Sequence, residues 1–131
     1  MMDLKNFDTK AKANEGVEIE LRDLRTGKGS GAFIRVLGTD SDKFAELSAE
    51  RSRQVATILE RTGKKELSRE EVNGLTVDLL AGCTVGWRGL KDGGEPFEYS
   101  DERAKKLYEG YPAIREQVNL AIADRTNFLL A

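Results

Sequence analysis

The chain has 131 residues, of which 39% are hydrophobic and 34% are charged, a composition typical of one globular domain with a small core and a densely ionic surface. Its 21 basic and 23 acidic residues nearly cancel and are interspersed, which argues against a nucleic-acid-binding regulator because phosphate neutralisation requires clustered Lys and Arg. A single cysteine and the lack of histidine exclude an intramolecular disulfide and the usual zinc ligand sets.

The first segment, residues 1–16, carries only scattered apolar side chains, so we expect a flexible lead-in before a single domain over residues 17–131. This segment lacks the apolar centre of a signal peptide, and no apolar run approaches the roughly 18–20 residues of a membrane span. We therefore expect no membrane association and a location in the cytoplasm.

A β-hairpin is expected at the start of the domain. Apolar and charged residues alternate over residues 17–21, which is the period of a half-buried strand. A second strand is expected over residues 32–37. The glycine-rich sequence TGKGSG over residues 26–31 lies between them and allows the chain to reverse, so the two strands should pair antiparallel.

Two amphipathic helices are predicted next. Residues 39–41 offer N-cap side chains, and the apolar residues that follow recur every three or four positions as far as Gly63. Ser68 and Glu71 have the spacing of a capping box, so a second helix should begin there and end near Val85.

The C-terminal part predicts a loop and two further helices. Residues 86–99 contain Gly and Pro and are expected to form an ordered loop rather than a helix or strand. Ser100 caps a short third helix, and Pro112 opens a fourth that should continue to Phe128. The fold class is therefore α+β: an antiparallel hairpin followed by about four helices in one domain.

Candidate chemical sites all have a simpler structural interpretation. The GKGS sequence at residues 27–30 lacks the spacing of a phosphate loop and suits a hairpin turn. Cys83 has helical spacing with apolar residues and no histidine to activate it, so we expect a buried small hydrophobe. Asp78 lies in an apolar stretch and is expected to form a structural ion pair, with Arg88 as a candidate partner. We expect no catalytic, metal or cofactor site, and no enzyme.

Trp87 is the most distinctive local feature, because a lone tryptophan at a helix end is either a core plug or an anchor for a partner. The core plug is the stronger interpretation. We expect Trp87, Phe97 and Phe128 to lie near one another, and the residues 86–99 and the last helix are candidate walls of a binding groove. The candidate partner-binding residues are Trp87, Arg88, Leu90, Phe97, Tyr99 and Phe128.

Several segments recur in one known family: VEIEL, VLGTDSDKF, VGWRGL, KDGGEPFEYSDERAKKLYEGYPAIREQV and AIADRTNFL. The most specific part is GWRGL, followed by a glycine-rich loop, Pro96-Phe97, Tyr99-Ser100 and Asn127-Phe128-Leu129. With these segments, roughly residues 17 to 129 resemble the tail assembly chaperones of long-tailed, siphovirus-type bacteriophages and prophages.

The resemblance implies a protein that binds the tape-measure protein in the host bacterial cytoplasm, keeps it soluble and helps recruit tail-tube subunits. Such a protein is absent from the mature virion, and the resemblance brings no catalytic residues or cofactors. Many members have a longer form made by ribosomal frameshifting, so a frameshifted extension stays open, as does a homo-oligomer. The alternative is a structural virion component, such as a small tail or head–tail joining protein.

Overall fold

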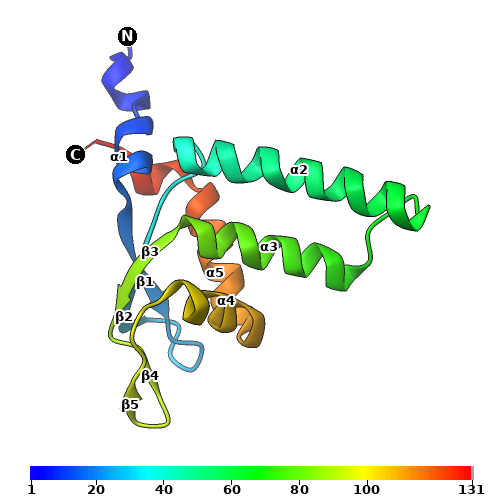
Figure 1. The fold of residues 1–131 in the computed structure, drawn as a ribbon. Coiled ribbons are helices and arrows are strands. Elements are labelled where there is room, and N and C mark those ends of the chain that lie inside the picture. Colours follow the sequence, from blue (N-terminus) through cyan, green and yellow to red (C-terminus); the bar gives the residue numbers. More distant parts are fainter. Residues whose placement is uncertain (131) are drawn as a thin grey trace.

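A three-stranded antiparallel sheet forms one side of the molecule in the computed structural model, which describes residues 1–130 (Figure 1). Its strands are β1 (Val17–Arg22), β2 (Gly29–Val36) and β3 (Thr84–Arg88), in the order β1-β2-β3. β1 and β2 form the expected hairpin, with GKGS in and beside its turn. The fold class is therefore α+β, as predicted.

The third strand differs from the sequence-based expectation, which is a helix as far as about Val85 and a loop over residues 86–99. β3 pairs antiparallel with β2, and Trp87 lies opposite Ile34. The register with β2 shifts between Arg35 and Val36. Residues of β3 therefore do not alternate between more buried and more exposed positions as those of β1 do. Its position depends on pairing with a strand about fifty residues earlier, which local sequence patterns do not contain.

The two long helices begin and end where their caps predict. α2 (Asp42–Thr62) starts after Ser41, whose side chain accepts a hydrogen bond from the Phe44 N–H, and ends at Gly63 in the left-handed conformation. α3 (Arg69–Cys83) starts with a complete capping box of Ser68 and Glu71. Together they form an antiparallel helical hairpin that projects away from the sheet, here called the α2–α3 arm (Figure 1).

The remaining helices are α4 (Asp101–Gly110), α5 (Pro112–Ala123) and the short 3₁₀ helix η2 (Arg125–Phe128). The fourth predicted helix therefore ends before Phe128. Asp124 adopts an extended conformation, and its side chain accepts a hydrogen bond from the Thr126 N–H, which starts η2 instead. Between Arg88 and α4, β4 (Lys91–Asp92) and β5 (Glu95–Pro96) form a second, smaller hairpin.

The core lies between the sheet and the helices. Its fully buried side chains come from β2, α3, α4, α5 and η2 and include Ile34, Val36, Leu80, Tyr108, Val118, Ile122 and Phe128. The Tyr108 hydroxyl lies 2.6 Å from Thr84 Oγ1, which itself donates to the Leu80 carbonyl at 2.8 Å. These two buried hydroxyls are thus both satisfied.

The N-terminal segment differs from the expected flexible lead-in. It contains η1 (Leu4–Phe7) and the helix α1 (Lys10–Glu15), and Ala13 is only 1% exposed. The Gly38 N–H donates to the Ala13 carbonyl at 3.1 Å, and the Asp42 N–H donates to Asn14 Oδ1 at 2.8 Å. Order here comes from contacts with the β2–α2 connection, which the segment's own sequence does not show.

None of the helices described within residues 1–130 combines the length and the apolarity that crossing a bilayer requires.

Candidate partner-binding groove

A groove of about 680 Å³ lies between α2, α3 and the start of α4, at the end of the arm that joins the domain. Leu47 of α2 and Leu75 and Leu79 of α3 supply apolar side chains to its lining. Charged residues of the three helices complete it: Lys43, Glu50, Arg51, Asp78, Asp101 and Lys105. An apolar floor between charged walls is the form of a site that accepts an amphipathic helix.

The groove exists because α2 packs on one side only. This helix has 21 residues and none of them is buried. Its apolar stripe is half-buried against α3 and includes Phe44, Leu47, Val55, Ile58 and Leu59. Near the base of the arm, Gly82 allows close packing, because a Cβ at this position would lie 2.6 Å from Leu47 Cδ1. Of this stripe, Leu47 lines the groove.

The two walls of the groove differ in charge. Lys43 and Arg51 lie on the α2 wall beside Glu50, whose carboxylate forms an ion pair with Arg53 outside the groove. On the opposite wall, Asp78 of α3 and Asp101 of α4 face the same space, together with Lys105 of α4, which pairs with Asp78. The α2 wall is therefore mainly basic and the opposite wall is more acidic.

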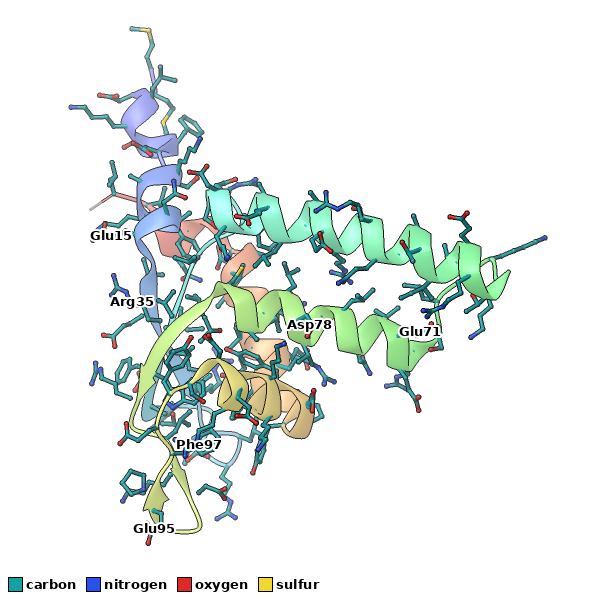
Figure 2. The ribbon with its side chains drawn as sticks, in the orientation of Figure 1. Glu15, Arg35, Glu71, Asp78, Glu95 and Phe97 are labelled. Atoms are coloured by element: carbon teal, nitrogen blue, oxygen red, sulfur yellow. The ribbon has the colours of Figure 1, made fainter. Side chains whose placement is uncertain are left out.

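The ion pair expected between Asp78 and Arg88 is absent from the described residues. Asp78 lies on α3 (Figure 2) and instead approaches Lys105 of α4, with 3.8 Å between Oδ1 and Nζ. Arg88 lies on the outer face of the sheet, where its Nε donates to Glu18 at 2.9 Å and its guanidinium lies 4.1 Å from the centre of the Phe33 ring. The intervening strand β3 carries Arg88 away from α3.

Three of the predicted partner-binding residues form one aromatic cluster. Trp87 stacks on Phe97 with ring centres 5.6 Å apart and meets Tyr99 edge-on at 5.0 Å. Trp87 Nε1 also donates to the Phe97 carbonyl at 2.6 Å, which fixes the base of the β4–β5 hairpin, where Figure 2 places Phe97. All three side chains pack against the core, which agrees with the core-plug interpretation.

Tyr99 connects the aromatic cluster with the groove. It lines the groove, and its hydroxyl lies 2.9 Å from both the Thr84 carbonyl and Asp101 Oδ1. Desolvation, reinforced by the hydrogen bond to Asp101, raises the pKa of Tyr99 to about 12. The hydroxyl therefore stays protonated at neutral pH and holds the Asp101 carboxylate at the groove wall.

Phe128 and Leu90 lie elsewhere. Phe128 is buried against Gly38, where a Cβ would lie 3.0 Å from its ring, so the expectation that it joins Trp87 and Phe97 is wrong. It anchors η2 near α1 instead. Leu90 is half-buried and lines a small cavity of about 110 Å³ together with Phe97. Of the six predicted residues, only Tyr99 lines the groove.

The α2 residues of the groove were not identified from the sequence. The signal was the apolar periodicity of this helix, which places Leu47 on its apolar stripe. Sequence periodicity does not distinguish a stripe that faces the core from one that is only half covered.

Two further observations concern possible metal ligands and the single cysteine. Within residues 1–130, no group of three or more His, Cys, Asp or Glu side chains is placed to hold a metal ion. Cys83 is fully buried, as expected, and desolvation raises the pKa of its thiol to about 11.

A family model for the YdaY prophage protein matches residues 39–128. This match covers more than half of the chain, so the chain belongs to the YdaY prophage protein family. It starts just before α2 and includes the whole arm, the aromatic cluster and η2, whereas α1 and the β1–β2 hairpin precede it. No curated protein and no solved structure matches the chain.

Proposed function

We propose that this member of a prophage protein family is a tail assembly chaperone, a non-enzymatic protein that binds the tape-measure protein in the host cytoplasm. In this role it keeps the tape-measure protein soluble, helps recruit tail-tube subunits, and is absent from the mature virion. The prophage family supports the setting. The motifs around Trp87 and Phe97 support the chaperone resemblance. The observation that carries the binding role is the groove at the base of the arm, with Leu47, Leu75 and Leu79 in its lining.

A helix is the occupant that the groove fits best. The groove follows α2 from Lys43 to Gln54, which is about 18 Å at 1.5 Å per residue, so a partner helix can lie along it over about three turns. The partner would place its apolar stripe on Leu47, Leu75 and Leu79. A tape-measure protein consists largely of long helices, and unassembled amphipathic helices associate through such stripes unless another surface covers them.

The charges on the two groove walls restrict the orientation in which a partner helix can bind. Acidic residues of the bound helix would face Lys43 and Arg51, and basic residues would face Asp78 and Asp101. Flanking charges of this kind determine partner choice and direction in coiled coils more than they determine affinity. The groove would therefore select helices by the side on which their charges lie.

Co-expression tests the proposal. The chain is produced with the tape-measure protein of the same prophage, and soluble and co-purified tape-measure protein is measured with and without the chain. Arg51→Glu reverses a charge of the groove wall, and Arg61→Glu reverses an exposed charge on the same helix that lies outside the groove. We expect the wild type and Arg61→Glu to keep the partner soluble, and Arg51→Glu to reduce co-purification about tenfold.

An insoluble, unbound partner in the presence of the wild-type chain contradicts the proposal. Equal losses for Arg51→Glu and Arg61→Glu would place binding outside the groove. The alternative of a structural virion component makes a different prediction, because the chain would then form a persistent symmetric oligomer and be found in purified particles.

A further inference from the structure

The outer edge of β1 is a second surface that the groove does not involve. β1 is the end strand of the sheet, on the side away from β3. At its C-terminal end, the Arg22 N–H donates to Gln117 Oε1 at 2.7 Å, and Gln117 Nε2 donates to the Arg22 carbonyl at 3.1 Å. The side-chain amide of Gln117 on α5 thus occupies the place that a neighbouring strand would take.

The backbone direction of the other β1 residues follows from this arrangement. Arg22 points its backbone groups away from β2, whereas the Asp23 N–H points toward it and donates to the Lys28 carbonyl at 2.7 Å. The register with β2 shifts between Glu20 and Arg22, but the extra residues lie on β2, where four steps face two on β1. β1 therefore keeps its alternation, and Glu18 and Glu20 also point their N–H and C=O groups outward. Within residues 1–130, no hydrogen bond to these outward groups is present. These unpaired N–H and C=O groups form a short open strand edge over residues 18–20.

Apolar side chains accompany this edge. A hollow of about 590 Å³ beside it is lined by Ile19 of β1 and by Leu24 and Leu120, which are 75% and 63% exposed. A second hollow of about 470 Å³ continues past Gln117. A strand placed next to β1 would therefore cover apolar surface on its α5 side while it completes the backbone hydrogen bonds.

We propose that the β1 edge binds an extended segment of another protein, which adds to the sheet as a fourth strand. The segment alternates basic and apolar residues. Its basic residues lie opposite Glu18 and Glu20 on the outer face, and the apolar residue between them faces Leu120. Opposite charges directly across a strand pair stabilise it, and the carboxylates retain free acceptor positions beside their bonds to Arg88 and the Gly31 N–H.

A second copy of this chain is the wrong occupant for this edge. Gln117 already takes the backbone groups of Arg22, so only Glu18 and Glu20 remain free to pair. In a symmetric antiparallel dimer, each register that pairs these residues places Glu18 or Glu20 opposite Glu18 or Glu20 of the other copy. Like charges directly opposite each other destabilise a strand pair, which favours a basic segment from a different protein.

A short synthetic peptide of alternating Lys and Val tests the proposal, with a Glu-Val peptide of the same length as the matched control. Hydrogen exchange is measured by NMR on the full chain with each peptide. We expect the Lys-Val peptide to slow exchange of the Glu18 and Glu20 amides at least tenfold and the Glu-Val peptide to leave it unchanged. Leu120→Asp, at an exposed position, should weaken binding about tenfold, whereas Leu4→Asp, also exposed but distant, should not.

Three results would overturn the proposal. The first is no protection of these amides by either peptide, and the second is equal protection by both. The third is a dimer in which the two amides are protected without any peptide, which would assign the edge to self-association. Because the β1 edge and the α2–α3 groove share no residues, failure here leaves the tape-measure proposal intact, and the reverse also holds.

Discussion

Asp40 links three segments that are distant in the sequence, and its ionisation should make the stability of this junction depend on pH. Its carboxylate accepts two hydrogen bonds from Arg125, at 2.8 and 2.9 Å, and one from the Thr9 hydroxyl at 2.6 Å. These bonds, with Arg125 contributing most, lower the pKa of Asp40 from 3.8 to about 2. α1, the β2–α2 connection and η2 are thus joined at one carboxylate.

The contribution of Asp40 to the free energy of unfolding follows from the difference between its pKa values in the folded and unfolded states. A lowering by nearly two pH units corresponds to roughly 2 kcal/mol of stability if taken at face value. The Arg125 side chain is 65% exposed, so solvent screening reduces the expected contribution to about 1 kcal/mol. Because the folded-state pKa is the lower one, this stability is fully present above pH 3.8 and is lost as the pH falls toward 2.

Urea unfolding of the wild type and Asp40→Asn at pH 7 and near pH 3 measures this effect. We expect Asp40→Asn to cost about 1 kcal/mol at pH 7 and about half of that near pH 3, where unfolded Asp40 is mostly protonated. Asp42→Asn is the matched control, since that exposed carboxylate makes only a 3.8 Å pair with Lys10 and should show a small penalty. A penalty for Asp40→Asn that is the same at both pH values would refute the reasoning.

Three further predictions concern the core and the sheet. Tyr108→Phe removes the hydrogen bond to Thr84, which keeps its second partner, and should cost about 1 kcal/mol in urea unfolding. Gly89→Ala should destabilise the fold by about 1–3 kcal/mol, because φ is +83° and the new Cβ would lie 2.5 Å from the Gly31 carbonyl oxygen; Gly86→Ala, which meets no atom within 4 Å, is the control. The buried Cys83 thiol, with its pKa of about 11, should react with a disulfide reagent at least a hundredfold more slowly in the folded chain than in urea, and fast reaction in the folded state would contradict its burial.

The helices were predictable because their ends are encoded within a few residues. Ser41, Ser68 and Ser100 each accept a hydrogen bond from a backbone N–H three residues later, and Gly63 ends α2 in a conformation that favours glycine. Such interactions need no distant partner. The first hairpin was predictable for the same reason, since alternation over residues 17–21 and a glycine-rich turn are both local.

The parts that were missed all depend on distant partners. α1 has no side-chain cap of its own, and contacts with Gly38 and Asp42 hold it in place. β3 is placed by its pairing with β2 across a register shift. Phe97 and Phe128 are both aromatic residues in specific motifs, yet one lies at the small hairpin and the other beside α1. Sequence identifies such residues as apolar anchors but does not specify which part of the core each one reaches.

The construction of the α2–α3 arm explains why we assign the binding role to it. Beyond Leu75 toward the tip, neither helix has a buried residue, so the outer part of the arm is ordered mainly by local interactions. These include the capping box of Ser68 and Glu71 and the 3.7 Å ion pair between Glu71 and Lys64. Local interactions of this kind order the tip but add little to the stability of the core. The half-exposed apolar stripe of α2 leaves apolar surface in contact with water in the isolated domain. A partner helix that covers part of this surface would remove that cost, which explains why the domain has so long a helix.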